Sequence, residues 1–182
     1  MSSRIRSQAL KSKVMSAHDA AALIPPGSTV GMSGFTGSGY PKAVPPQLAQ
    51  RIEDAHAAGD AFRLNLWTGA STGPELDGAL AKADGIERRL PYNSDPIARE
   101  KINSGQMDYL DMHLSQLAPA VWQGVLGPLD TAVIEVSAIN DDGSLVPSSS
   151  IGNNKTWLDR AERVILELSL IHISEPTRRT PI

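Results

Sequence analysis

Short apolar runs alternate with amphipathic segments along the chain. Residues 62–69 (FRLNLWTG) alternate at period two, and residues 129–139 (LDTAVIEVSAI) form an almost continuous apolar run, so both are predicted to be strands. Apolar runs bounded by turn residues predict further strands at 28–35, 86–92 and 163–167.

Helices are predicted between these strands from capping residues and from apolar positions three or four residues apart. The first of them is expected to run to Ile24, while Gly59 and Gly105 end the second and the fourth. This alternation of strands and helices along the chain predicts an α/β domain with a mostly parallel sheet and flanking helices. The expected helix starts are Ser16, Pro45-Pro46, the capping-box spacing Thr72-Gly-Pro-Glu75, Asp95, and Asn153 or Asn154.

The composition is typical of one globular domain and excludes several classes of function. With 182 residues, 41% of them hydrophobic and 20% charged, the chain can bury a sizeable core. The net charge of −3 provides no basic surface for nucleic acid, and without cysteine there is no disulfide, thiol nucleophile or cysteine-ligated metal. Neither a signal peptide nor an apolar run of about 18 residues is present, so no membrane partner is expected and the cytoplasm is the expected compartment.

Ligands of open parallel sheets bind at the carboxyl ends of strands, so the turns that follow the predicted strands are the places for a site. Residues 31–42 (GMSGFTGSGYPK) contain four glycines, whose amides can hold an anion. The spacing is neither that of a dinucleotide-binding loop nor that of a P-loop, since Tyr40 stands where lysine is required. A ligand-binding loop and a tight structural turn therefore both remain open.

Three further turns carry polar side chains. In the second turn, Thr72 is expected to cap a helix and Ser71 to be free to face a ligand. In the third, Asn93 and Ser94 can offer hydrogen bonds, and the fourth, residues 146–154, can bind an anion or only cap a helix. The four histidines form no set that could activate a serine, so a serine hydrolase is not predicted.

Glu135 stands inside the apolar run 129–139, where an ionised carboxylate needs a partner. We interpret it as the partner of a buried arginine rather than as a site residue. No pair of histidines has the spacing of metal ligands, so no metal is predicted.

Five sequence motifs follow one another between Arg4 and Glu167. Together they resemble the N-terminal part of the acetyl-CoA hydrolase/transferase family, and within it the succinyl-CoA:acetate CoA-transferases are the most similar group. The motifs are SGFTGSGYPKAVP from Ser33, TGASTGPELDGALAKADGI from Thr68, RLPYNSD from Arg89, HLSQLA from His113 and GSLVPSSSIGN from Gly143.

The resemblance implies a CoA-transferase-like fold, shared with sugar-phosphate isomerases, in a longer chain of two similar α/β domains that forms a dimer. It implies transfer of CoA between acetyl- or succinyl-CoA and a small carboxylate such as acetate or succinate, with coenzyme A as part of the substrate and no separate cofactor. In that family a glutamate of the C-terminal domain attacks the acyl-CoA, and a glutamyl-CoA thioester follows. That domain is expected to be missing here, so Glu135 is not assigned as the nucleophile and no catalytic residue is expected.

By the same resemblance, seven residues match the family motifs that face the pocket for the acyl group and the carboxylate. Two alternatives remain open: an acetyl-CoA hydrolase, and a stand-alone α/β ligand-binding module without catalysis. At one of these positions, Ser94, relatives can carry threonine. The residues are Phe35, Thr36, Gly37 and Gly39 of the glycine loop, Ser71, Asn93 and Ser94.

The last residues, 168–182 (LSLIHISEPTRRTPI), start like a strand but end without another element. Residues 168–178 are also what the translation of a common transposase-type sequencing adapter gives. We therefore expect residues 1–167 to be an incomplete N-terminal CoA-transferase domain and residues 168–182 to be non-native.

Resequencing of intact genomic DNA across the codon for Glu167 tests this expectation. The reading frame should continue with different residues from position 168 onward and enter a second α/β domain. Native codons for residues 168–178 would contradict the expectation.

Overall fold

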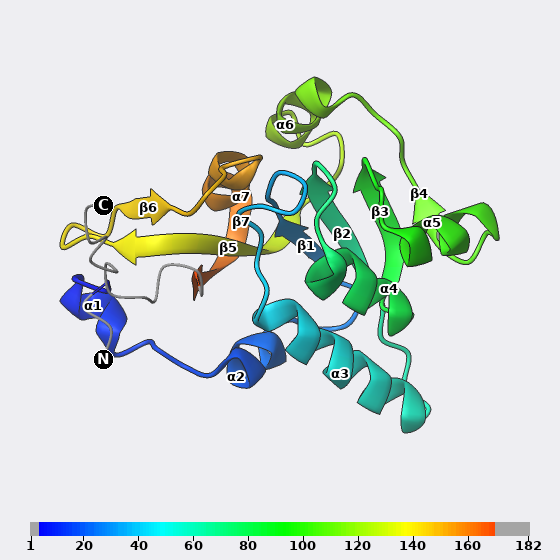
Figure 1. Cartoon of the computed structure of the whole chain (residues 1–182), viewed down its shortest axis with the longest axis horizontal. Helices are drawn as coiled ribbons and strands as arrows, with labels where there is room; N and C mark the ends of the chain where they lie inside the picture. The colour runs from blue at the N-terminus through cyan, green and yellow to red at the C-terminus, as the bar shows by residue number, and fades with distance from the viewer. Residues whose placement is uncertain (1–3, 170–182) are drawn as a thin grey trace, which may run out of the picture.

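A seven-stranded sheet of mostly parallel strands forms the centre of the molecule (Figure 1). The computed structural model describes residues 4–169. The strand order is β4-β3-β2-β1-β5-β6, β7 also pairs with β5, and within the described residues every strand ladder is parallel except β5–β6. The strands are β1 (Thr29–Met32), β2 (Leu64–Gly69), β3 (Ile86–Pro91), β4 (Asp108–Tyr109), β5 (Leu129–Ile139), β6 (Leu145–Pro147) and β7 (Ala161–Leu168).

Helices cover both faces of this sheet, with α2, α3 and α4 on one side and α6 and α7 on the other (Figure 1). The predicted fold class, an α/β domain with a mostly parallel sheet and flanking helices, is therefore confirmed. The helices are α1 (Gln8–Lys11), α2 (Ala17–Ala22), α3 (Val44–Ala57), the π-helical turn η1 (Pro74–Gly78), α4 (Ala79–Lys82), α5 (Pro96–Asn103), α6 (Leu114–Trp122) and α7 (Asn154–Arg160).

Strand alternation divides the apolar core into two parts. Successive residues of a strand point to opposite faces of the sheet. Leu66 of β2 and Val133 of β5 pack on the side of α2, α3 and α4, whereas Trp67 of β2 and Ala132 of β5 pack on the side of α6 and α7. The sheet is thus buried on both faces, which explains why β5 reads as a continuous apolar run in the sequence.

The predicted helix caps are confirmed at two sites. Ser16 caps α2 because its hydroxyl accepts the backbone N–H of Asp19 (3.0 Å). Asp95 caps α5 because its carboxylate accepts the N–H groups of Ile97 and Ala98, each at 2.9 Å. Both caps satisfy amides that the first helical turn leaves without partners. The two prolines expected at the start of α3 also lie in its first turn.

Other predictions at helix ends differ from the structure. The helix α2 ends at Ala22 rather than at Ile24. Asn153 occupies the N-cap position of α7, but its side chain makes no capping hydrogen bond. Its backbone N–H instead donates to the hydroxyl of Ser33 (2.8 Å), which ties α7 to the end of β1. The capping box expected at Thr72 is not formed either, because the Thr72 hydroxyl donates to the carboxylate of Asp77.

The sequence pattern does not predict β4, β6 or α6. The strands β4 and β6 have two and three residues, too few to show a period. The helix α6 contains Pro119, a residue that normally ends a helix. These elements depend on tertiary packing more than on local pattern.

The end of β7 reaches into the segment expected to be non-native. Leu168 is the last residue of β7, and Ser169 donates its backbone N–H to the carbonyl of Val136 (2.8 Å). The rest of that segment, residues 170–182, lies outside the described part of the chain. The expectation of an adapter sequence therefore stays a prediction.

A close contact between β1 and α7 requires a glycine at position 31. A Cβ atom on Gly31 would lie 3.0 Å from Cδ2 of the Trp157 ring and 3.3 Å from Cδ1 of Leu129. Trp157 is fully buried, and its ring centroid is 6.1 Å from that of Trp67. The ring therefore has little room to move away from an added methyl group.

Replacing Gly31 by alanine should lower the free energy of unfolding by about 1–3 kcal/mol, because the added methyl group overpacks the Trp157 ring. Urea denaturation measures this loss. Gly37→Ala is the matched control, since a Cβ on Gly37 would meet nothing within 4 Å. An equal loss in both variants would show that the close contact is not the cause.

Candidate functional site

Four loops meet at the edge of the sheet where its parallel strands end. Because β1, β2 and β3 are parallel neighbours, the loops that follow them lie at one edge. The loop after β6 reaches the same edge, since Ser150 Oγ donates to the carbonyl of Ser38 (2.7 Å). The structure thus brings together all four turns that carry candidate chemistry in the sequence. The four loops are residues 33–43, 70–73, 92–95 and 148–153.

The glycine loop, residues 33–43, has an exposed tip and a packed stem. Phe35 and Ser38 exchange backbone hydrogen bonds of 2.8 and 3.1 Å. Phe35, Thr36 and Gly37 are exposed at this tip. Gly39 has a φ of 70°, and a Cβ there would come within 2.3 Å of a serine hydroxyl in the loop after β6. Gly39 therefore serves the packing of two loops, whereas the tip is open to a ligand.

Ser71, Asn93 and Ser94 also lie together at this edge. The backbone N–H of Ser94 donates to the hydroxyl oxygen of Ser71 (3.0 Å). Ser71 is buried, while the side chain of Ser94 is exposed. Asn93 donates from Nδ2 to the carbonyl of Asp95 (3.2 Å), and its buried Oδ1 has no hydrogen-bond partner within residues 4–169. That oxygen is shielded from solvent, so a ligand can reach it only if the loop after β3 moves.

A buried ion pair underlies the loops after β2 and β3. Asp77 of η1 and Arg89 of β3 are both fully buried. Arg89 Nε donates to Oδ1 of Asp77 (2.9 Å), its Nη2 donates to Oδ2 (3.1 Å), and its Nη1 donates to the carbonyl of Leu90 (2.6 Å). This two-pronged geometry fits the planar guanidinium to the carboxylate.

The same carboxylate explains why the predicted capping box is wrong. Thr72 donates its backbone N–H (2.9 Å) and its hydroxyl (2.8 Å) to Oδ2 of Asp77, so its side chain bonds to a carboxylate of η1 rather than to a backbone N–H of the first turn. The turn η1 instead begins after Gly73, with no side-chain cap. Burial by itself raises the pKa of Asp77, but the charge and hydrogen bonds of Arg89, helped by Thr72, bring that pKa below its ordinary value.

Glu75, the other expected member of the capping box, pairs with the stem of the glycine loop. Tyr40 donates its phenolic O–H to Oε2 of Glu75 (2.5 Å). Burial and this carboxylate together raise the pKa of the Tyr40 phenol, and the hydrogen bond lowers the pKa of Glu75. The stem of the glycine loop is thereby fastened to η1.

The partner of Glu135 is a lysine, so the expected pairing with a buried arginine is wrong. Lys42 Nζ donates to Oε2 of Glu135 (2.9 Å) and to the carbonyl of Tyr40 (2.7 Å). Arg89, which is buried, is already held by Asp77. Glu135 of β5 is thus paired through Oε2 with a lysine, while its buried Oε1 has no hydrogen-bond partner within residues 4–169.

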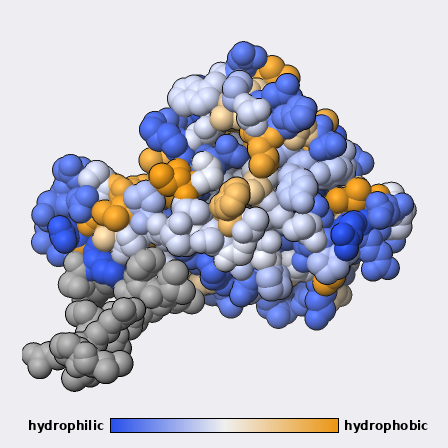
Figure 2. Space-filling view, turned by 45° about the horizontal axis from the view of Figure 1, so that its top comes forward, coloured by the Kyte–Doolittle hydropathy of each residue, from blue (hydrophilic) through white to orange (hydrophobic). Residues whose placement is uncertain are grey.

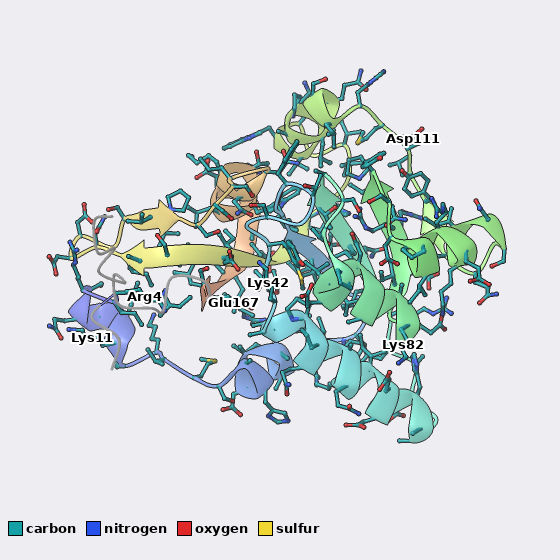
Figure 3. All side chains as sticks on the ribbon, in the orientation of Figure 1. Arg4, Lys11, Lys42, Lys82, Asp111 and Glu167 are labelled. Atoms are coloured by element: carbon teal, nitrogen blue, oxygen red, sulfur yellow. The ribbon has the colours of Figure 1, made fainter. Side chains whose placement is uncertain are left out.

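A second carboxylate, Glu167 of β7, caps α3 from a distance. Its Oε1 accepts the backbone N–H groups of Lys42 (2.6 Å) and Ala43 (3.0 Å), and its Oε2 accepts that of Val44 (2.9 Å). Figure 3 places Lys42 and Glu167 next to each other, between β5 and α3. Since the following two residues of α3 are prolines without N–H groups, one carboxylate satisfies most of the first-turn donors.

The edge of the sheet also presents apolar side chains. Phe35, Tyr92 and Ile151, one from each of three loops, are 60%, 50% and 53% exposed. In Figure 2, where the top of Figure 1 comes forward, apolar patches interrupt the polar surface. Together with the hydroxyl and amide groups, these side chains provide the mixed lining that is common in small-molecule sites.

The chain matches the family model described as acetyl-CoA hydrolase/transferase N-terminal domain, over residues 1–174. It belongs to this family. The resemblance of the five motifs is thereby confirmed at the level of the whole sequence.

Curated relatives agree with this assignment. The chain is 41% identical to a succinyl-CoA:acetate CoA-transferase of Clostridium kluyveri over 98% of its length, and 42% identical to a propanoyl-CoA:succinate CoA transferase of Escherichia coli over 87%. It is 35% identical to an acetyl-CoA hydrolase of Schizosaccharomyces pombe over 100%. These matches cover 35%, 32% and 38% of the relatives, so the chain spans about a third of their length.

Solved structures share the fold at low sequence identity. RipA from Yersinia pestis has a TM-score of 0.66 and 18% identity over 88% of this chain and 38% of its own. Glutaconate coenzyme A-transferase from Acidaminococcus fermentans has a TM-score of 0.60 and 13% identity over 91% of this chain and 68% of its own. The expected CoA-transferase-like fold is therefore confirmed.

In the part of the chain that the structure describes, no group of three or more His, Cys, Asp or Glu side chains is placed to hold a metal ion. None of the helices there has the length and apolar character that a membrane span requires.

Sequence reasoning missed the polar groups that support the loops. Asp77, Arg89, Lys42 and Glu167 were not candidates, because their partners lie on other elements and no local spacing signals such pairs. Arg89 had one usable sign: it stands in a predicted strand next to a leucine that must be buried, where a lone charge requires a partner.

Replacing Glu167 by glutamine should cost about 1–3 kcal/mol of the free energy of unfolding, because three backbone amides, those of Lys42, Ala43 and the buried Val44, lose a charged acceptor. Chemical denaturation followed by circular dichroism measures it. Glu162→Gln, an exposed change on the same strand, is the control and should stay within about 0.5 kcal/mol of the unmodified chain. Equal effects of the two changes would refute the capping role of Glu167.

Proposed function

We propose that this chain is the N-terminal part of a CoA-transferase that moves CoA between acetyl- or succinyl-CoA and a small carboxylate such as acetate or succinate. The reaction runs through a glutamyl-CoA intermediate, and its nucleophilic glutamate belongs to a part of the whole protein that this chain does not contain. The observation that carries the proposal is the family match together with CoA-transferases among the relatives. The whole protein is proposed to act as a dimer.

The loop edge of the sheet supplies the N-terminal side of the substrate pocket. The exposed tip at Phe35, Thr36 and Gly37 contacts the acyl group with its ring and presents backbone amides to a carboxylate. The exposed hydroxyl of Ser94, next to Asn93, offers a donor and an acceptor beside it. These groups bind and orient substrate, since orientation by fixed groups contributes to the rate of a transfer between two bound reactants.

An acetyl-CoA hydrolase is the second candidate, because the Schizosaccharomyces pombe relative carries that name. The two activities differ in the acceptor: water takes the acyl group in hydrolysis, whereas a carboxylate takes the CoA in transfer. A hydrolase releases free CoA from acetyl-CoA in the absence of any added carboxylate, whereas a transferase needs the carboxylate.

The proposal is tested with two proteins. The 182-residue chain alone should form no succinyl-CoA from acetyl-CoA and succinate, because it lacks the nucleophile. Residues 1–167 joined to the C-terminal remainder of the Escherichia coli relative should restore transfer, measured by chromatography of the CoA esters. Turnover by the chain alone would contradict the assigned place of the nucleophile. A folded but inactive chimera would contradict the proposed function, and CoA release without succinate would favour the hydrolase.

A further inference from the structure

One buried carboxylate connects the loops that follow two different strands. Oδ2 of Asp77 accepts two hydrogen bonds from Thr72, at 2.8 and 2.9 Å, and lies 3.4 Å from the hydroxyl of Ser71. The hydroxyl of Ser71 in turn accepts the backbone N–H of Ser94 (3.0 Å). A continuous series of polar contacts therefore runs from Asp77 through Ser71 to the loop after β3.

Arg89 fixes the orientation of this carboxylate. Its two hydrogen bonds of 2.9 and 3.1 Å engage both oxygens of Asp77, and its third, of 2.6 Å, holds the carbonyl of Leu90. Because both side chains are fully buried, no water competes for the carboxylate, and its rotation would leave the guanidinium of Arg89 and the two donors of Thr72 without their partner. The orientation of Asp77 is thus set from β3, the strand that leads into the loop carrying Ser94.

The backbone around the pair is shaped to admit it. Asp77 stands on a π-helical turn, a local widening that often accompanies functional sites. At Gly78, a Cβ would lie only 3.1 Å from a carboxylate oxygen of Asp95, the residue that caps α5. The turn that carries Asp77 therefore packs directly against the start of the helix after Ser94.

On the basis of the proposed function, we propose that Asp77 and Arg89 are positioning residues of the CoA-transferase site. They hold the Ser71 hydroxyl and the Ser94 backbone in one arrangement, so that the exposed Ser94 side chain and the neighbouring Asn93 meet substrate in a fixed geometry. Neither member of the buried pair touches substrate itself. The pair acts through Ser71, which is the connection between the two loops.

Amide hydrogen exchange of the 182-residue chain tests the connection directly. In Asp77→Asn, the amides of Thr72 and Ser94 should both exchange about tenfold faster or more, although Ser94 does not contact Asp77. In Ser71→Ala, only the Ser94 amide should exchange faster. Core amides such as that of Val133 correct for any change in global stability.

Asp84→Asn is the matched control for this exchange experiment. Asp84 also accepts from two cations, Arg63 and Lys101, but it lies before β3 and is partly exposed. It should leave both loop amides unchanged. An unchanged Ser94 amide in Ser71→Ala, or in a folded Asp77→Asn, overturns the proposal. If Asp77→Asn does not fold, the result from Ser71→Ala decides.

Kinetics of the chimera separate positioning from mere stability. In folded samples, Arg89→Met should lower kcat/KM for transfer about 100-fold, since a displacement of about 1 Å in a positioning group has that effect. Arg89→Lys, which keeps a cation beside Asp77, should recover at least part of the loss. Unchanged kcat/KM in folded Arg89→Met overturns the positioning role. An inactive unmodified chimera counts against the proposed function, while the exchange data still decide whether the two loops depend on Asp77.

Discussion

The buried pair of Asp77 and Arg89 is the constraint on which the arrangement of the candidate site depends. Two opposite charges without solvent contact cost several kcal/mol each in lost hydration, and only close pairing with further hydrogen bonds offsets that cost. Here Thr72 and the carbonyl of Leu90 supply the additional bonds. Removing one partner would leave the other as an uncompensated buried charge, a loss of about 3–5 kcal/mol.

A second set of polar contacts supports the other side of the site. Glu135 and Glu167 stand opposite each other on β5 and β7, and both bind Lys42. Glu135 accepts from the side chain of Lys42, and Glu167 accepts from its backbone N–H. The stem of the glycine loop is thus fixed to the sheet and to the start of α3. A rigid stem below an exposed tip favours binding, because the loop then loses less conformational entropy when a ligand binds.

The general fold could be predicted from the sequence, but the polar supports of the site could not. The run at 129–139 and the cap at Asp95 are local signals, and both correspond to observed elements. Thr72 misled the prediction because a capping box relates it to Glu75, three residues on, whereas its hydroxyl donates to the carboxylate of Asp77, five residues on. Family motifs identified the loops with Ser71 and Ser94, but the dependence of one on the other is a tertiary property.

The arrangement of the candidate site requires Asp77 and Arg89 to act as one unit. A double-mutant cycle with Asp77→Asn and Arg89→Met, followed by urea denaturation, measures their coupling. The double variant should be less destabilised than the sum of the single variants by about 2 kcal/mol or more, because each single change alone leaves a buried polar group unsatisfied. Additivity of the two changes within about 0.5 kcal/mol would contradict the account.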